Sequence, residues 1–187
     1  MNINTKMLWA GACSSVARGQ QLQAQLQGTL YADEREDPSA LPFAALVTGI
    51  SDDPATLASH ADRGLYLVCE RLIKPGQATL FGLFPMFAKA GLSHAQADAH
   101  WRDQHAPLAL VHHAFMTEYR QLSVVATVSG TPYDGFALCG FNSLDDLRER
   151  FFSEPDSRDV ISADIAKFAD TRRSPRRLLA IPRRLEH

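Results

Sequence analysis

The sequence has no long hydrophobic run, no strong excess of one charge and no paired cysteines. Its uncharged apolar stretches, such as residues 78–88, are much shorter than the roughly 20 residues that a helix needs to span a bilayer. Its formal net charge is only −2, from 19 basic and 21 acidic side chains, whereas a general nucleic-acid binder is usually strongly basic. We therefore expect a soluble globular protein whose partners include neither a membrane nor a nucleic acid.

The three cysteines are odd in number and widely spaced, at Cys13, Cys69 and Cys139. They provide no disulfide framework and no CxxC pair, so we expect reduced thiols that pack as small apolar side chains in a cytoplasmic protein. The apolar run after Lys6 is about six residues long, shorter than the roughly 7–15 residues of a signal-peptide core, so no secretion signal is predicted. Residues 185–187 resemble the remnant of a purification tag, for which we expect no functional role.

Several common catalytic patterns are also missing. The sequence contains no GxGxxG, GxxxxGK[ST] or GxSxG pattern, which excludes the usual dinucleotide, nucleotide and serine-hydrolase sites. It has no HExxH pattern, and His100 and His105 are five positions apart, so they are not expected to share one face of an α-helix. We therefore expect no metal and no cofactor, with a metal site assembled from distant residues as the alternative.

The sequence does contain enough apolar residues, 45% of 187, for one substantial core. Apolar runs bounded by turn residues predict strands at residues 6–12, 29–32, 43–50, 65–73, 79–88, 116–128, 136–141 and 178–181. Apolar periodicity and capping residues predict helices at residues 16–27, 93–105, 108–114, 143–152 and 156–169, and another that begins at Asp53-Pro54. Each half then reads β-α-β-β-α-β, the ferredoxin-like unit, and the fold class is α+β.

Short internal similarities support a tandem repeat of this unit. Leu8-Trp9 resembles Leu80-Phe81, and Ala45-Leu46 resembles Ala137-Leu138. We expect a degenerate ferredoxin-like half at residues 1–75 and a second half at residues 76–184 that carries the chemistry, followed by the tag remnant. Residues 74–77 are the only linker between the halves, so the two should pack as one body.

Two polar residues lie on otherwise apolar helix faces of the second half. In the helix that begins at Ser93, Ala97, Trp101 and His105 recur at i, i+4 and i+8 and so share a face. From spacing alone, His105 either caps the helix and packs on Trp101 or acts in acid–base chemistry. Asp164 lies on the apolar stripe of a later helix, where a carboxylate needs a partner. It is either a structural cap or ion-pair partner, or a group that orients an imidazole.

Other polar groups have simpler interpretations. His112 and His113 follow in the next turn region and are expected at the surface. Near the C-terminus lie six arginines without interleaved aromatic residues, which indicates a solvated edge strand or ion pairs rather than nucleic-acid binding. They are Arg172, Arg173, Arg176, Arg177, Arg183 and Arg184.

The second half also resembles a known family. The segments KAGLS at residues 89–93, HWRDQHAPL at residues 100–108 and ADIAKF at residues 163–168 resemble the signature of EthD-domain proteins, named for ethyl tert-butyl ether degradation. The resemblance extends over residues 79–181. His100 departs from the pattern, because the family usually has an aromatic or bulky residue before the tryptophan, and the first half carries no such motif.

The resemblance implies a dimeric α/β-barrel fold in which ferredoxin-like units pair their sheets face to face, here both from one chain. It also implies a small catabolic or biosynthetic enzyme that performs cofactor-free acid–base chemistry, of the cyclase, isomerase, dehydratase or oxygenase type, on a small aromatic, lactone or polyketide-like molecule. In this interpretation His105 is the general acid/base, Asp164 fixes its tautomer and Tyr119 hydrogen-bonds the substrate. The predicted substrate pocket is formed by Trp101, Phe81, Phe84, Phe87, His112 and Phe168.

Alternatives to an enzyme stay open at this stage. The protein could be a non-catalytic binding or accessory protein of an oxidative degradation system, in which the motif joins helices to the sheet. A haem-binding barrel is the third reading. The expected assembly is either a homodimer of the fused chain or a single chain that completes its own barrel.

Overall fold

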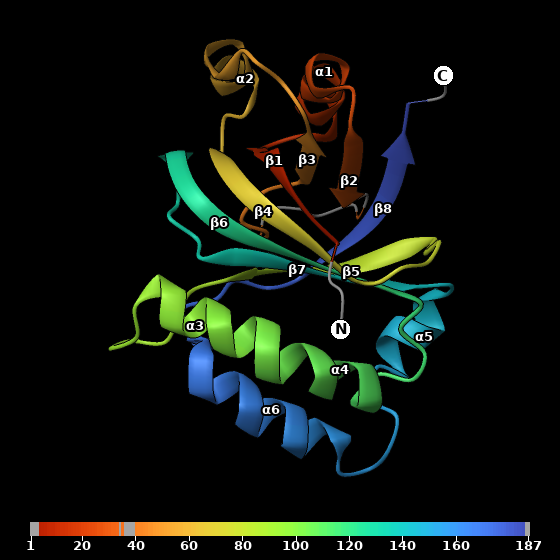
Figure 1. Cartoon of the computed structure of the whole chain (residues 1–187). Helices are drawn as coiled ribbons and strands as arrows, with labels where there is room; N and C mark the ends of the chain where they lie inside the picture. Colours follow the sequence, from red (N-terminus) through yellow and green to blue (C-terminus); the bar gives the residue numbers. More distant parts are fainter. Residues whose placement is uncertain (1–3, 34, 36–39, 186–187) are drawn as a thin grey trace.

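The computed structural model describes residues 4–33, 35 and 40–185, and it contains an eight-stranded closed barrel (Figure 1). Around the barrel the strands follow the order β1-β3-β2-β8-β5-β7-β6-β4, and every neighbouring pair is antiparallel. The strands are β1 (Asn4–Cys13), β2 (Thr29–Asp33), β3 (Ala45–Gly49), β4 (Gly64–Lys74), β5 (Leu80–Met86), β6 (Glu118–Gly130), β7 (Gly135–Phe141) and β8 (Leu178–Arg184). The expected combination of helices with a β-barrel is confirmed.

Helices cover the barrel on two opposite sides. In Figure 1, α1 and α2 lie above the barrel and α3, α4 and α6 lie below it. The helices of the first half are α1 (Val16–Leu26) and α2 (Pro54–His60). Those of the second half are α3 (His94–His100), the π-helix η1 (Trp101–His105), α4 (Ala106–His112), α5 (Leu144–Arg148) and α6 (Ser157–Phe168). Among the described residues, no helix has the length and apolar character required to cross a membrane.

The strands of both halves have the same spatial order. In the first half the neighbours run β4-β1-β3-β2, and in the second they run β8-β5-β7-β6. The barrel closes because β2 pairs with β8 and β4 pairs with β6. The last strand therefore lies between β2 and β5, and the expectation of an edge strand at the C-terminal arginines is wrong.

Alternation along the strands separates an inner core from the clusters outside the barrel, because successive side chains point to opposite faces. Leu8, Leu46 and Leu138 are in the cluster inside the barrel, whereas Leu80 packs in a cluster that also includes helix residues. The similarity of Ala45-Leu46 to Ala137-Leu138 thus joins residues with the same orientation. The similarity of Leu8-Trp9 to Leu80-Phe81 instead joins residues on opposite faces of the sheet, one register step apart.

The two ends of the barrel interior differ in chemistry. One end is filled by an aromatic cluster with ring centroids 5.0–6.5 Å apart, formed by Phe43, Tyr66, Phe87, Tyr133 and Phe136. At the other end, where β6 begins and β4 ends, buried Glu70 and Glu118 both pair with Arg120. Apolar packing closes the first end, whereas the second, which we call the polar end, holds charged groups.

Two helix expectations and one expectation about burial need correction. Helical backbone continues through Pro107 without a break, as described below. The segment expected to be helical at residues 143–152 is helical only at Leu144–Arg148, and after it the rings of Phe151 and Phe152 pack on His113. That packing buries His113, which was expected at the surface. Of the predicted tag remnant, residues 186–187 lie outside the described part of the chain.

Candidate functional site

The segment from Ser93 to His112 forms one helical rod that changes its pitch in the middle. A capping box starts α3: Ser93 Oγ accepts from the Gln96 amide at 3.2 Å, and the Gln96 side chain accepts from the Ser93 amide at 2.9 Å. Ala97, Trp101 and His105 are all buried, which confirms that they share the inward side. Gly135 of β7 leaves space for Trp101, since a Cβ there would lie 2.6 Å from the indole ring.

Pro107 explains the change of pitch. A proline inside a helix has no N–H, and its ring clashes with the carbonyl four residues earlier. Here the preceding turn is widened to a π-turn, in which the Ala106 amide donates to the Trp101 carbonyl five residues back. The same carbonyl accepts a second hydrogen bond, at 3.0 Å, from Gln121 Nε2 on β6. The sheet therefore holds the π-turn in place.

The π-turn brings two histidines to one carboxylate. In an α-helix, residues five apart point in directions that differ by roughly 140°, but a π-turn stacks them. His105 Nδ1 lies 3.0 Å from Asp164 Oδ2, and His100 Nε2 lies 3.0 Å from Asp164 Oδ1. The expectation that His100 and His105 face different directions is therefore wrong. We call His100, His105 and Asp164 the His–Asp cluster.

The environment of the cluster is apolar and nearly closed to solvent. His105 and Asp164 are 7% and 5% exposed. The Phe168 ring stacks on His100 with centroids 5.3 Å apart and packs on His105 at 5.1 Å. Lys167 Nζ, itself exposed, adds a third donor to Asp164 at 3.3 Å. The carboxylate thus joins α3, η1 and α6.

The charges of the cluster set the proton positions. Burial acts to raise the pKa of Asp164, but hydrogen bonds from His100, His105 and Lys167 outweigh it and lower the pKa below its ordinary value. For His105, burial lowers the pKa below 6.5, although Asp164 opposes the shift. An ionised Asp164 only accepts, so Nδ1 of neutral His105 carries the proton and Nε2 does not. Within the described residues, Nε2 of His105 has no hydrogen-bond partner.

Tyr119 lies near the cluster but is bonded to other groups. Its hydroxyl accepts hydrogen bonds from Trp101 Nε1 at 3.2 Å and from Gln121 Nε2 at 3.1 Å. The residue is fully buried, and this burial raises its pKa. The structure therefore brings Tyr119 to Trp101, not to the free nitrogen of His105.

The predicted pocket residues are divided among several places. Trp101 and Phe168 share one cluster between the sheet and the helices. Phe84 belongs to a neighbouring cluster, and His112 Nδ1 bonds Ser157 Oγ at 2.9 Å. Phe81 and Phe87 point into the barrel interior, on the other face of the sheet. The structure thus does not bring these last two to His105, because their strand positions alternate with the outward-facing ones.

Two pockets stand out among the described residues, and His105 lines neither of them. One, of about 590 Å³, lies at the polar end of the barrel. The other, of about 330 Å³, lies beside α5 and includes Phe151, Phe152 and Arg177. No group of three or more histidine, cysteine or acidic residues in the described ranges is placed to hold a metal ion.

Sequence reasoning missed the partners His100, Gln121 and Lys167. The available signal was Ala106-Pro107, since a proline inside a helical pattern demands either a kink or a widened turn. Only a widened turn makes His100 and His105 neighbours. Nothing in the local sequence marks Gln121 as the residue that binds the π-turn.

Comparison with known proteins places the site within a family match. A model of the EthD domain matches residues 89–172, which is less than half of the chain and runs from before α3 to just after α6. No curated protein matches the chain. A crystal structure described as that of an anthrone oxidase-like protein matches with a TM-score of 0.52 and 10% identity, over 98% of this chain and 93% of the other.

A second solved structure is that of a protein proposed to be a monooxygenase, from Lactobacillus acidophilus NCFM. It has a TM-score of 0.48 and 6% identity, and the match covers 95% of this chain and 93% of that one. The likeness to the anthrone oxidase-like protein concerns the fold alone, whereas the family match concerns the segment that builds the His–Asp cluster. Residues 89–172 thus match the EthD domain model, and the matched segment includes His100, His105 and Asp164.

Proposed function

We propose that this EthD-domain protein is an enzyme that uses His105 as a general acid/base, without a metal or organic cofactor. The observation that carries the proposal is the 3.0 Å contact between His105 Nδ1 and Asp164 Oδ2, which leaves Nε2 as a basic nitrogen with no partner among the described residues. A carboxylate bonded to one ring nitrogen fixes the tautomer and stabilises the cation that forms when the other nitrogen takes a proton.

The proposed step is a reversible proton transfer. Nε2 of His105 takes a proton from an acidic C–H or O–H of the substrate, and the C–H or O–H electron pair stays on the substrate as an enolate or phenolate. The imidazolium is stabilised by Asp164 and then returns the proton to another atom of the substrate or to the leaving group. Such proton transfers contribute typically 10²–10⁴-fold to the rate.

The apolar surroundings support a hydrophobic substrate. Phe168 and Trp101 belong to the apolar cluster between the helices and the sheet. The proposed class of substrate is therefore a small aromatic, lactone or polyketide-like molecule. A desolvated site also keeps His105 neutral, which is the form that accepts a proton. His100 is the second imidazole on Asp164 and positions the carboxylate.

One observation favours a second candidate function. His105 is buried and lines neither of the two pockets, as expected if the cluster only anchors η1 to α6. The protein would then be a binding or accessory protein. The two candidates differ in what the loss of His105 changes: a reaction rate in the first, and only stability in the second.

The test is hydrogen–deuterium exchange of acidic C–H groups in D₂O, measured by NMR over a panel of aryl ketones, unsaturated lactones and 1,3-diketones. For a compound that the wild type exchanges, we expect His105→Ala to lower the rate by roughly 10²–10⁴-fold. Asp164→Asn should lower it as well, because an amide does not stabilise the imidazolium. His112→Ala is the matched control. His112 lies on the same helical rod as His105, but its ring bonds Ser157 of α6 and not Asp164.

Unchanged exchange in His105→Ala would refute the acid–base role. A wild type that exchanges no compound, together with a His105→Ala variant that is only less stable, would favour the accessory function. Thermal unfolding of each variant separates loss of chemistry from loss of fold.

For the architecture we propose two tandem ferredoxin-like units, at residues 1–75 and 76–184. The shared strand order β4-β1-β3-β2 and β8-β5-β7-β6 supports this division. Since one chain already closes the barrel, a homodimer would use outer surfaces.

A cytoplasmic location is supported by the free state of the three cysteines.

A further inference from the structure

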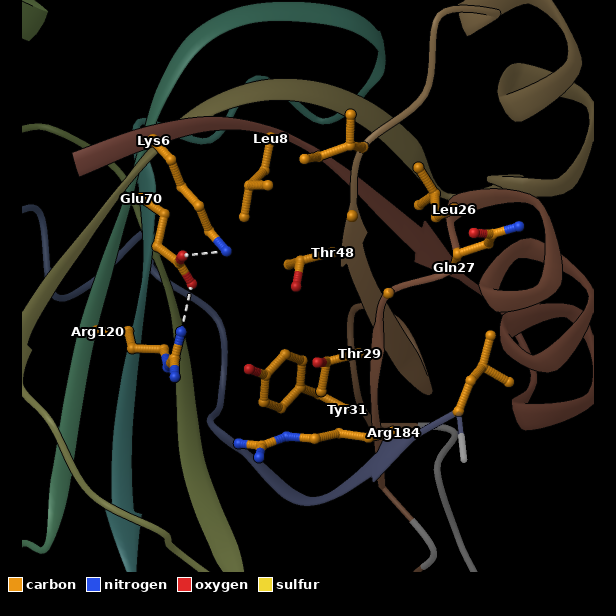
Figure 2. Close-up of a pocket in the computed structure, with 14 residues that line it drawn as sticks. Lys6, Leu8, Leu26, Gln27, Thr29, Tyr31, Thr48, Glu70, Arg120 and Arg184 are labelled. Atoms are coloured by element: carbon orange, nitrogen blue, oxygen red, sulfur yellow. Dashed lines mark hydrogen bonds and ion pairs between the residues drawn. The ribbon is translucent and has the colours of Figure 1, made fainter. Parts of the chain in front are cut away.

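A pocket at the polar end of the barrel lies away from the EthD motif. It holds about 590 Å³ and is bordered by the start of β1, the turn between α1 and β2, and the ends of β3 and β8 (Figure 2). Most of it is built by residues that precede the EthD domain, and no member of the His–Asp cluster lines it. Its chemistry is therefore independent of the proposed acid–base site.

The charges around this pocket do not cancel. Arg120 pairs with Glu70 at 2.8 Å and with Glu118, and Lys6 Nζ lies 3.4 Å from Glu70. Arg184 also lines the pocket and extends into it in Figure 2, but within the described ranges no carboxylate lies within ion-pair distance of it. Among the described residues at this end, three cations face the two carboxylates of Glu70 and Glu118, which leaves one positive charge uncompensated.

Hydroxyl groups add hydrogen-bonding capacity beside Arg184. Tyr31 and Thr48 are both buried residues of the lining, and in the part of the chain described neither hydroxyl makes a hydrogen bond to another protein group. Burial raises the pKa of Tyr31, so its hydroxyl stays protonated and can donate. Thr29 lies beside Tyr31 in Figure 2 and directly opposite Arg184 in the β2–β8 pair.

Part of the remaining lining is apolar. Leu8, Leu26, Ile50 and Leu185 provide its hydrophobic side chains, and Ile50 is 69% exposed although it is a large aliphatic residue. An apolar rim around an unpaired guanidinium suits a molecule with a hydrophobic body and one negative group.

We propose that the polar end of the barrel binds an organic monoanion, a carboxylate on a hydrophobic body. The carboxylate accepts hydrogen bonds from Arg184, Tyr31 and Thr48, and the body covers Leu26 and Ile50. A divalent cation would be repelled by the net positive charge, and an uncharged molecule would leave Arg184 without a partner.

The experiment is titration calorimetry of the full chain with 2-naphthoate, with the uncharged analogue 2-naphthylmethanol, and with acetate. We expect 2-naphthoate to bind about tenfold or more tightly than 2-naphthylmethanol, because a charge-assisted hydrogen bond is lost with the carboxylate. Acetate should bind more weakly still, since it lacks the body. Added salt should weaken the binding of 2-naphthoate.

Two variants locate the site. Arg184→Gln should weaken 2-naphthoate binding about tenfold and remove the preference over the alcohol, and Thr48→Val should weaken it less. The controls are Arg172→Gln, which removes an exposed arginine after α6, and His105→Ala, and both should bind as the wild type does.

Absence of measurable 2-naphthoate binding, equal affinity for the alcohol, or unchanged binding in Arg184→Gln would each overturn the proposal. Binding that is lost in His105→Ala and kept in Arg184→Gln would instead locate the ligand at the His–Asp cluster. Because the two sites share no residue, failure at one leaves the other standing.

Discussion

At the scale of single residues, the second half uses burial to keep histidines uncharged. His105 and His113 are both buried, and for both, burial lowers the pKa. Their partners differ: His105 bonds a carboxylate, whereas His113 Nδ1 donates to the Phe151 carbonyl at 2.6 Å. A carboxylate can stabilise an imidazolium strongly and a carbonyl much less, so only His105 has a partner suited to proton transfer.

His113 gives the residue-scale prediction, a loss of stability in acid. Its pKa is lowered from 6.5 to about 4, so between these values the unfolded chain binds a proton that the folded chain does not. The free energy of unfolding therefore falls as the pH drops from about 6.5 to about 4, by about 3 kcal/mol from this residue. Urea unfolding at a series of pH values measures this slope.

The control variant for this measurement is His113→Gln. It should flatten the dependence of the free energy of unfolding on pH between pH 6.5 and 4. Equal slopes in wild type and His113→Gln would contradict this account of the pH dependence.

At the scale of elements, the decisive feature is the π-turn inside the long helical rod. The start of the rod follows from the local sequence, because Ser93 and Gln96 form a capping box that needs no distant partner. The same is true of α2, where Asp53 caps the helix and Pro54 occupies its first position. Both were predicted from neighbouring residues alone.

The π-turn could not be predicted in this way. Pro107 signals a disturbance, but the alternatives of a break, a kink and a widened turn are decided by contacts with the sheet. Gln121, which binds the Trp101 carbonyl, is 20 residues away in the chain. The pairing of His105 with Asp164 spans 59 residues, so sequence patterns suggested each residue as a candidate and tertiary packing joined them.

At the scale of the whole molecule, closure of the barrel unites the two halves. Strand positions were predicted well because apolar runs and turn residues are local signals. Closure depends on pairing β2 with β8 and β4 with β6, which no local pattern specifies. The pocket at the polar end was missed for the same reason, since Lys6, Arg120 and Arg184 meet only when the barrel closes.

A closed barrel with one shared interior predicts a single cooperative unfolding transition. The two tryptophans report on the halves separately, because Trp9 is in β1 and Trp101 is in η1. The Trp101→Phe variant keeps only Trp9 as a fluorescent probe, and the Trp9→Phe variant keeps only Trp101. Both probes should report the same unfolding transition once the stabilities of the two variants are matched. Leu46→Ala, which removes a fully buried side chain from the barrel interior, should lower the stability seen by both probes by about 2–5 kcal/mol.

Two separated transitions, or a Leu46→Ala effect confined to the Trp9 probe, would show that the halves fold independently. That outcome would contradict a shared core. The matched control is Val111→Ala on α4, at a side chain that is 69% exposed, which should change neither probe.

The central claim is that Asp164 holds His105 with a protonated Nδ1 and a free, basic Nε2. The most direct measurement is ¹⁵N NMR of the histidine ring nitrogens through a pH titration, with the His105 signals assigned from the His105→Ala variant. We predict that Nε2 of His105 is unprotonated at pH 7, that it takes a proton only at a pH below the ordinary value of 6.5, and that Asp164→Asn changes the tautomer or lowers the pKa further. A His105 ring that is protonated on Nε2 at neutral pH, or one whose titration is the same in Asp164→Asn, would contradict the claim.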